Sequence, residues 1–182
     1  MMQSLTSCLK AKSLISVHRH DVDDHGIQGF LVGASDSLLV LEYVYDFQID
    51  GLMVLRRSDI TDVRRTATDE FQERLLKREG IRPGHQFSAS FELDSWQTII
   101  EQLSQHYPLM ILERELGPSP EFALGRSLRA TDAQVEFRSF NGIGKWADKT
   151  VRLKYAQLTC LQVGTRYIGF YQRHFERSPR HD

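Results

Sequence analysis

The sequence predicts a mainly β protein of two tandem small five-stranded barrels with one or two connecting helices. Blocks of residues recur at a nearly constant offset along the 182-residue chain. Short alternating apolar runs are separated by polar turns, which is typical of strands. Two segments between the copies have the apolar spacing of helices. Five short strands in each copy favour a barrel, because closing a sheet removes its open edges.

The repeat is clearest in two segments that begin with glycine. Residues 29–36 (GFLVGASD) and 125–132 (GRSLRATD) both end with a small residue, a hydroxyl residue and aspartate, at an offset of 96. Further aligned blocks are 55–63 (LRRSDITDV) with 153–161 (LKYAQLTCL) at an offset of 98, and 14–17 (LISV) with 109–112 (LMIL) at an offset of 95. Self-similarity of this length indicates a duplicated domain.

Each copy contains five segments with the pattern of short strands. In the first copy we expect strands at residues 14–20, 27–34, 38–45, 52–57 and 60–65. In the second copy we expect strands at residues 108–115, 123–130, 133–140, 149–155 and 158–163, with 166–173 as a candidate extra strand. Asp50-Gly51 and Asn141-Gly142 lie between alternating runs and predict hairpin turns.

Two helices are expected between the copies. Residues 69–78 begin with acidic side chains and end with basic ones, in accord with the helix dipole. Residues 94–107 offer Asp94 or Ser95 as an N-cap, repeat apolar residues at helical spacing and end before Pro108. The expected organisation is therefore a first barrel plus trailing helix at 1–80, a linker at 81–93, and a helix plus second barrel at 94–182.

The order of motifs in each copy resembles the Sm-like fold of the LSm and Hfq-type proteins. In the first copy, residues 27–29 (IQG) with 36–41 (DSLLVL) are similar to the first Sm motif, and residues 55–61 (LRRSDIT) to the second. The helix expected at 94–107, ahead of a strand, resembles the N-terminal helix of Sm proteins. The resemblance covers most of the chain and implies two Sm-like units, ring assembly and RNA binding. Barrels of the SH3 and PRC types share much of the same apolar pattern.

Both copies depart from the Sm pattern at the positions that would contact RNA. The spacing from glycine to aspartate is seven positions in both copies, one longer than in Sm motifs. The position of the base-stacking aromatic holds Leu38 in one copy and Gln134 in the other, and that of the base-reading asparagine holds Val40 and Glu136. Stacking worth about 1–3 kcal/mol per base needs an aromatic platform. We therefore expect the fold without the RNA pocket of the family.

Residues 18–25 (HRHDVDDH) combine three histidines and three aspartates. His18 and His20 are expected to project from one face of a strand and, with Asp23, are candidate ligands of zinc or another divalent ion. The alternative is the polar end of a strand and an aspartate-rich turn. The repeat favours the turn, because Glu113 and Glu115 stand at the positions equivalent to the histidines. We therefore expect no metal and no cofactor.

Basic residues are candidate contacts to nucleic acid in both copies. In the first copy, Arg56 and Arg57 could contact phosphate, although the nearby aspartates at positions 59 and 62 favour local ion pairs. In the second copy, basic and aromatic residues are mixed, and Arg129, Lys149 and Lys154 are the leading candidates. The alternative for these residues is an ordinary solvated strand face or a subunit contact.

Composition and charge limit the classes of function. No nucleophile elbow, phosphate loop or paired metal motif occurs, so we do not expect an enzyme. Two isolated cysteines, with no apolar secretory or membrane segment, favour a cytoplasmic protein without a membrane partner. Residues 1–125 carry 12 Lys+Arg against 19 Asp+Glu, a balance of −7, whereas residues 126–182 carry 11 against 5, a balance of +6. The opposite charges favour association between the two parts, within one chain or between subunits.

These features favour a noncatalytic cytoplasmic module for protein–protein interaction and assembly, built on Sm-like barrels. We expect a homo-oligomer, together with a protein partner that the sequence does not identify. The alternative is an RNA-binding protein that uses the basic face of the second barrel. A third hypothesis is a sensor of small molecules.

Overall fold

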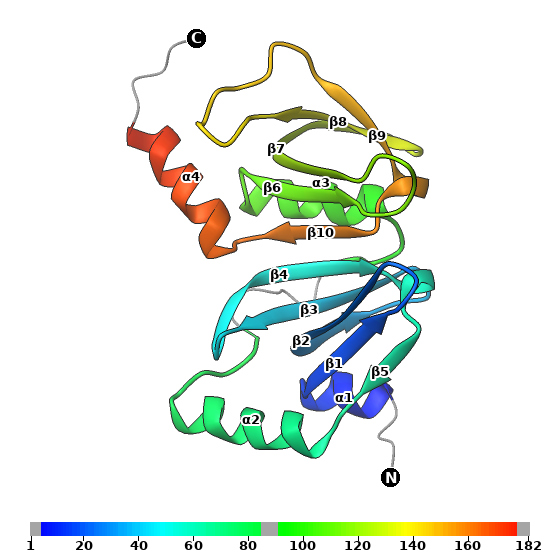
Figure 1. The fold of residues 1–182 in the computed structure, drawn as a ribbon, viewed down its shortest axis with the longest axis vertical. Helices are drawn as coiled ribbons and strands as arrows, with labels where there is room; N and C mark the ends of the chain where they lie inside the picture. The colour runs from blue at the N-terminus through cyan, green and yellow to red at the C-terminus, as the bar shows by residue number, and fades with distance from the viewer. Residues whose placement is uncertain (1–4, 85–90, 178–182) are drawn as a thin grey trace. The chain divides into compact units, whose positions relative to one another are not determined.

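Ten antiparallel strands and four α-helices make up the part of the chain that the structure, a computed structural model, describes: residues 5–84 and 91–177 (Figure 1). The chain divides between Asp94 and Ser95 into two compact units, called unit 1 and unit 2 below. Each unit has five strands and two helices, so the predicted mainly β class is confirmed. Part of the linker expected at 81–93, residues 85–90, lies outside the described residues.

Unit 1 consists of α1 (Leu5–Ala11), β1 (Leu14–Arg19), β2 (Asp23–Ala34), β3 (Leu38–Tyr45), β4 (Gln48–Arg56), the 3-10 turn η1 (Arg57–Asp59), β5 (Asp62–Arg64) and α2 (Ala67–Arg78). Its strand order is β5-β1-β2-β3-β4. Apolar side chains of the four longer strands are fully buried and form the core, among them Leu14, Phe30, Leu39, Leu41 and Leu55. The short helix α1 was not predicted from the sequence.

Buried carboxylates fix α2 to β1 and β2. Asp69 accepts hydrogen bonds from Ser16 Oγ (2.8 Å) and Gln28 Nε2 (2.9 Å). Glu73, one turn further along the helix, accepts from the backbone N–H of Leu14 (3.1 Å). The helix predicted at 69–78 is confirmed, and it docks through polar groups because its Asp69 and Glu73 side chains are more than nine-tenths buried.

Unit 2 consists of α3 (Trp96–His106), β6 (Met110–Arg114), β7 (Glu121–Ala130), β8 (Gln134–Ser139), β9 (Val151–Lys154), the 3-10 turn η2 (Tyr155–Gln157), β10 (Cys160–Val163) and α4 (Arg166–Arg177). Its strand order is β10-β6-β7-β8-β9, the same as in unit 1 when β10 is matched with β5. The helix predicted at 94–107 is confirmed as α3. Its Trp96, Ile99, Ile100 and Leu103 side chains are buried.

The two units share their strand registers under the offsets found in the sequence. Gly29 pairs with Tyr43 in unit 1, and 96 positions later Gly125 pairs with Ser139 in unit 2. Three further pairs in unit 1 have equivalents in unit 2 at offsets of 95, 96 and 98. Leu38↔Arg56 corresponds to Gln134↔Lys154, and His18↔Asp62 corresponds to Glu113↔Cys160. The pair Leu14↔Phe30 corresponds to the register in which β6 pairs with β7. The duplication seen in the sequence is therefore a duplication of backbone pairing.

Gly29 and Gly125 occupy equivalent close contacts between strands. A Cβ atom at Gly29 would lie 2.8 Å from the carbonyl oxygen of Glu42, and one at Gly125 would lie still closer to the carbonyl oxygen of Arg138. Only glycine allows these backbones to approach so closely. This contact explains why a glycine begins the repeated segment in both copies.

Neither sheet closes into the predicted barrel. Among the described residues, no ladder joins β4 to β5 or β9 to β10. The three-residue strand β5 pairs with β1, and the turn η1 separates it from β4. In the same way, η2 separates β10 from β9. The prediction of two closed five-stranded barrels is corrected to an open order of five strands in each unit, in which a 3-10 turn lies between the two strands that would have to pair for closure.

The candidate strand at 166–173 is wrong, because these residues begin the helix α4. Thr165 Oγ1 accepts a hydrogen bond from the N–H of Ile168 (3.2 Å), as an N-cap does. Ile168, Tyr171 and Phe175 recur at helical spacing and pack against the buried cluster Leu109, Ile111, Leu124 and Phe140. In a short segment, paired apolar residues fit either the strand or the helix period.

One of the two predicted hairpin turns is misplaced. The turn from β3 to β4 lies at Asp46 and Phe47, which both have positive φ (49° and 56°), as in a two-residue primed turn. Asp50 and Gly51 instead lie within β4, and Gly51 has a φ of 80° beside a register shift in the ladder with β3. The turn at Asn141 is confirmed, with the N–H of Gly144 donating to the carbonyl of Asn141 (2.9 Å).

Candidate functional site

The histidine- and aspartate-rich segment 18–25 lies at the end of β1, in a tight turn and at the start of β2. The turn is closed by a hydrogen bond from Val22 N to the carbonyl of Arg19 (2.7 Å). The rings of His18 and His20 stack with centroids 5.4 Å apart. Among the described residues, no group of three or more His, Cys, Asp or Glu side chains is arranged to hold a metal ion.

Asp23 is engaged locally with His25. Its carboxylate accepts hydrogen bonds from the backbone N–H of His25 (2.9 Å) and lies 2.8 Å from that ring's Nδ1. These hydrogen bonds lower the pKa of Asp23 and raise that of His25. The pair therefore acts as a turn contact, which is what the repeat favours for this segment.

The first-copy arginines proposed as phosphate contacts have different surroundings. Arg56 Nε is paired with Asp59 (2.8 Å), and Arg64 is paired with Asp62. Asp59 and Asp62 are the two aspartates whose proximity in the sequence favours local ion pairs. Arg57, in η1, has no hydrogen bond or ion pair to any side chain among residues 5–84 and 91–177. Its guanidinium is thus the cation of this segment that is left available for a ligand.

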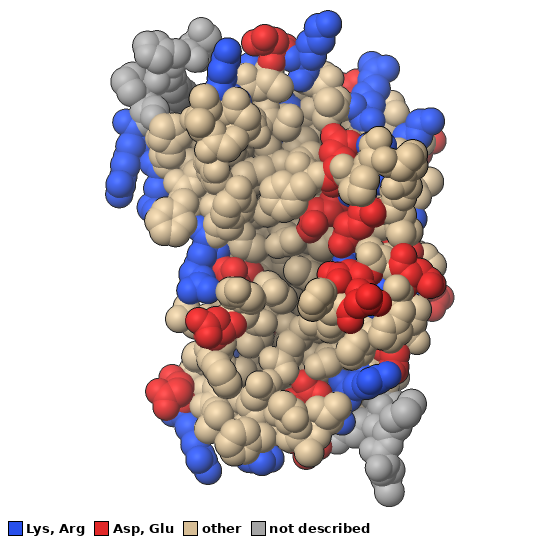
Figure 2. Space-filling model, in the orientation of Figure 1, with Lys and Arg blue, Asp and Glu red and all other residues tan. Residues whose placement is uncertain are grey.

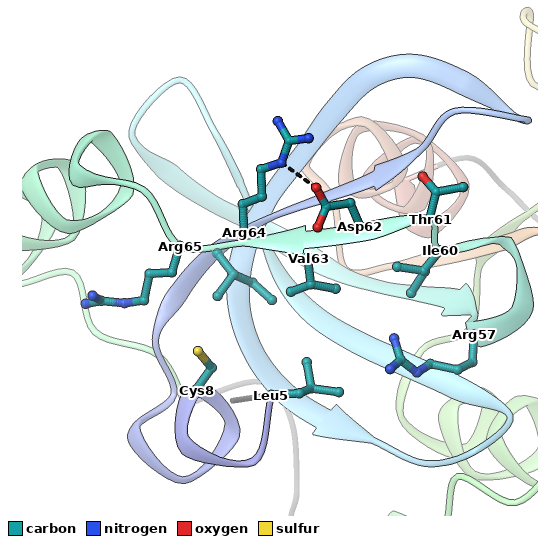
Figure 3. A pocket seen from close by; sticks show the side chains of 10 residues that line it. Leu5, Cys8, Arg57, Ile60, Thr61, Asp62, Val63, Arg64 and Arg65 are labelled. Carbon is teal, nitrogen blue, oxygen red and sulfur yellow. Dashed lines mark hydrogen bonds and ion pairs between the residues drawn. The ribbon is translucent and has the colours of Figure 1, made fainter. Parts of the chain in front are cut away.

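Arg57 lines a pocket of about 320 Å³ that we call the α1–β5 pocket (Figure 3). Leu5 and Cys8 of α1 form one side, and Ile60 and Val63 form the opposite side. The side chain of Arg57 extends towards the space between them (Figure 3). The remaining lining residues are Ile15, Thr61, Asp62, Arg64 and Arg65. The pocket thus combines apolar walls with one free positive charge.

Arg65 has a structural role at the margin of this pocket. Its guanidinium pairs with Glu70 and with Glu73 (3.0 Å for the latter), both on α2. In Figure 3 it points away from Arg57. Thr61 is also occupied, because its hydroxyl donates to the carbonyl of His18 (3.1 Å) and accepts from His20 N (3.2 Å). Neither Arg65 nor Thr61 is therefore available in the way that Arg57 is.

The second-copy candidates are all exposed. Arg129 lies in β7 opposite Glu136 of β8, and Glu136 also pairs with Arg152 (3.1 Å). Lys149 precedes β9, and Lys154 is its last residue. On the face drawn in Figure 2, lysine and arginine side chains project along the margin of unit 2, and acidic side chains lie on the same face. Glu136 therefore lies next to two of the basic residues of this surface, Arg129 and Arg152.

Arginine and aromatic side chains meet elsewhere in unit 2, on Trp146. The guanidinium carbons of Arg126 and Arg138 lie 5.1 and 5.7 Å from the centre of its ring, within the range of cation–π contacts. Trp146 also packs against Phe140 and Phe175, with ring centroids 5.0 Å away in both cases. A groove of about 520 Å³ runs beside this cluster, lined by Pro108, Leu109, Arg126, Trp146, Gln172, Phe175 and Glu176.

Two sheet edges provide a further candidate surface. β5 stands at one end of the unit 1 strand order, and β9 at one end of the unit 2 order. Among the described residues, the ladders of these strands are with β1 and β8, respectively. Their other sides present backbone N–H and C=O groups that an added strand could bind.

Neither the pocket nor the groove was predicted from the sequence. A signal for the pocket was present in the alignment of the two copies, in which Arg57 is equivalent to Tyr155 and Ile60 to Leu158 at the offset of 98. The groove depends on α4, which was considered only as a strand. Trp146, Arg126 and Arg138 belong to the mixed basic and aromatic residues of the second copy, but no sequence pattern indicates that they contact one another.

Comparisons with protein-family models, with curated proteins and with solved structures gave no match to this chain. The Sm-like resemblance therefore stays a prediction from the sequence. In the portion of the chain that the structure describes, none of the helices has the length and apolar character needed to cross a membrane.

Proposed function

We propose that the protein is a noncatalytic assembly module whose copies associate through their sheet edges. In this proposal, β9 of one copy pairs with β5 of another copy. The observation that carries the proposal is the pair of sheet edges, one in each unit, whose outer sides have no ladder among the described residues. Two different edges on one chain give a head-to-tail contact, which can propagate into a ring or a filament.

The backbone of β9 presents donors on its outer side at known residues. Tyr155, just after β9, donates its N–H to the carbonyl of Ala133, towards β8. Because inward and outward N–H groups alternate along an antiparallel strand, those of Leu153 and Val151 also point to β8. The N–H groups of Arg152 and Lys154 therefore point outwards. They are the donors that a partner strand would use.

Net charge supports contacts between unlike units. Residues 1–94 carry 11 Lys+Arg against 15 Asp+Glu, a balance of −4, and residues 95–182 carry 12 against 9, a balance of +3. Opposite net charges steer unit 1 of one copy towards unit 2 of another and disfavour contacts between like units. Exposed charges on the edge, such as Arg152, also oppose unspecific strand pairing.

Sedimentation velocity or light scattering over a range of concentrations tests the proposal. Arg152→Pro removes an outward N–H and leaves the hydrogen bonds from β9 to β8 intact, so we expect it to weaken self-association at least tenfold. Arg152→Gln keeps the N–H and is the matched control for the lost charge. We expect it to retain association with a reduced dependence on salt.

Two results would contradict the assembly proposal. One is a wild-type protein that stays monomeric at the highest concentration reached. The other is an Arg152→Pro variant that is folded by circular dichroism and associates as strongly as wild type.

A second candidate function is binding of single-stranded RNA at the groove beside Trp146. The observation that favours it is the placement of Arg126 and Arg138 over the Trp146 ring. Arginine next to an aromatic ring provides both a phosphate contact and a stacking surface for bases. The exposed Arg129, Lys149 and Lys154 would add contacts to the backbone of the RNA.

Fluorescence anisotropy with short labelled RNAs at several salt concentrations tests this candidate. Arg126→Gln is expected to weaken binding and lower its salt dependence, because one phosphate contact is lost. Neutralising Arg129, Lys149 and Lys154 together should lower the affinity and its salt dependence further. Absence of binding at low salt removes RNA as a ligand and leaves the assembly proposal unaffected.

A further inference from the structure

The α1–β5 pocket of unit 1 has a filled counterpart in unit 2. The helices α1 and α3 end at equivalent residues, Ala11 and His106, at the offset of 95 that relates β1 to β6. The pocket positions can therefore be compared residue by residue between the units. Of the ten equivalent side chains in unit 2, Gln162, at the position of Arg64, is partly exposed, and the other nine are buried: Ile100, Leu103, Met110, Tyr155, Leu158, Thr159, Cys160, Leu161 and Val163.

The residues on two sides of the pocket differ from their equivalents in unit 2 in burial or size, and these differences keep the pocket open. Ile60 and Val63 are half-buried in unit 1, whereas their equivalents Leu158 and Leu161 are at most 1% exposed. Leu103, in the position of Cys8, is a larger apolar side chain. The same backbone framework thus encloses a packed core in unit 2 and a space of about 320 Å³ in unit 1. This volume lies at the lower end of the range of about 300–1,000 Å³ for small-molecule sites.

The largest chemical difference between the two places is Arg57 against Tyr155. Tyr155 is 9% exposed, and burial raises its pKa to about 12, so it is a neutral part of the core. Arg57 holds a permanent positive charge beside apolar walls, without a carboxylate partner among the described residues. An arginine in this setting binds carboxylate or phosphate with two parallel hydrogen bonds.

The pocket's cysteine does not suggest a reaction. Cys8 is buried, and its pKa lies above the ordinary value because burial and nearby Glu73 raise it more than Arg65 lowers it. A neutral thiol is a weak nucleophile and behaves as a small apolar group. The arrangement therefore fits reversible binding of a ligand.

We propose that the α1–β5 pocket binds a small amphipathic anion. The apolar body of the ligand lies between Leu5 and Cys8 on one side and Ile60 and Val63 on the other. Its carboxylate or phosphate head group pairs with Arg57. This proposal does not rest on the assembly proposal, because it is argued from the pocket that Arg57, α1 and the residues of β5 line, and not from pairing between strands of different copies.

Calorimetric titration of the full chain with octanoate, octyl phosphate, octanol and inorganic phosphate tests the proposal. We expect one or both amphipathic anions to bind, and octanol and inorganic phosphate to bind at least tenfold more weakly. Tighter binding of octanoate identifies a carboxylate head, and tighter binding of octyl phosphate identifies a phosphate head. Both results support the proposal.

Substitutions locate the site. Arg57→Gln is expected to weaken binding of the preferred anion by about 10- to 100-fold, as for loss of a hydrogen bond to a charged group, and Arg57→Lys to restore part of it. Arg57→Tyr reproduces the residue of unit 2 and should abolish binding by filling the space. Arg78→Gln, on the exposed face of α2 away from the pocket, is the matched control and should bind as wild type does.

Three results with the wild-type protein overturn the proposal. They are equal binding of octanol and octanoate, equal binding of inorganic phosphate and octyl phosphate, and no binding of either amphipathic anion. Unchanged binding by a folded Arg57→Gln variant also overturns it, because the anion would then lie elsewhere.

Discussion

Arg57 and Tyr155 stand at the same position of the two units. Each is the first residue of a 3-10 turn. Arg57 donates its N–H to the carbonyl of Ser37 (2.8 Å) in the turn between β2 and β3, and Tyr155 donates to Ala133 (3.0 Å) in the equivalent turn between β7 and β8. The backbone is therefore the same, and only the side chain decides whether the place beneath the turn is open and charged or closed and apolar.

This relationship predicts that Tyr155→Arg strongly destabilises unit 2. The substitution places an unpaired charge in a site with 9% exposure and removes an aromatic side chain, for an expected cost of about 3–5 kcal/mol. Urea unfolding followed by circular dichroism measures it. The converse exchange, Arg57→Tyr, should leave the free energy of unfolding unchanged or raise it by about 1 kcal/mol, since it buries apolar surface. Equal and small effects of both exchanges would mean that the two places are not equivalent.

Glycine at the strand contact is the second expected point of sensitivity. Gly125→Ala should lower the free energy of unfolding by about 3 kcal/mol or more, because its Cβ would overlap the carbonyl oxygen of Arg138 and force β7 away from β8. Gly29→Ala should have a similar but smaller effect. Gly142→Ala is the control, because nothing lies within 4 Å of its Cβ position. Thermal unfolding of the three variants measures these effects. A Gly125→Ala variant as stable as wild type would contradict the prediction.

The repeat made these backbone features predictable from the sequence. Spacing of glycine, aspartate and alternating apolar residues determines which residues of neighbouring strands can pair, so the offsets of 95, 96 and 98 reappear as registers. Closure of the sheets was not predictable in this way. It depends on the path of the chain through η1 and η2, and the turn residues Arg57–Asp59 carry no sequence signal for a 3-10 turn.

The elements that the sequence did not predict correctly were mainly short ones or ones whose apolar pattern fits both a strand and a helix. The helix α1 has seven residues, too few to be stable alone, so it depends on tertiary contacts such as burial of Cys8. For the candidate sites, the sequence identified residues of the right chemical type but did not predict the surroundings of each side chain. Arg56 and Arg57 are neighbours in sequence, yet the first is paired with Asp59 and the second lines a pocket.

Acid is expected to destabilise unit 1 through the carboxylates of α2. Burial raises the pKa of Asp69, but hydrogen bonds from Thr66, Gln28 and Ser16 lower it by more, so the net pKa is below the ordinary value. For Glu73, burial raises the pKa and contacts from Lys77, Leu14 N and Arg65 lower it by more.

A carboxyl whose pKa is depressed in the folded state stabilises that state above its unfolded pKa, about 3.9 for Asp and 4.3 for Glu. This stabilisation is lost as the pH falls through the lower, folded pKa. The contribution of these two carboxyls to the free energy of unfolding should therefore be level above about pH 5 and decrease steadily below about pH 4. Urea unfolding at a series of pH values tests this. Asp69→Asn should cost about 1–3 kcal/mol at neutral pH and flatten the acid dependence, and an unchanged acid dependence in this variant would contradict the assignment.

The two faces of α4 should respond differently to the same substitution. Phe175 packs on Phe140 and Trp146, with ring centroids 4.8 and 5.0 Å away, so Phe175→Ala is expected to cost about 2–3 kcal/mol and to shift Trp146 fluorescence to longer wavelength. Phe170 is 70% exposed and contacts Arg173 on its own helix, so Phe170→Ala should change stability by less than about 0.5 kcal/mol. Denaturant unfolding and fluorescence spectra measure both variants. If Phe170→Ala were the more destabilising of the two, α4 would bury the opposite face from the one described, and the groove beside Trp146 would lose its Phe175 wall.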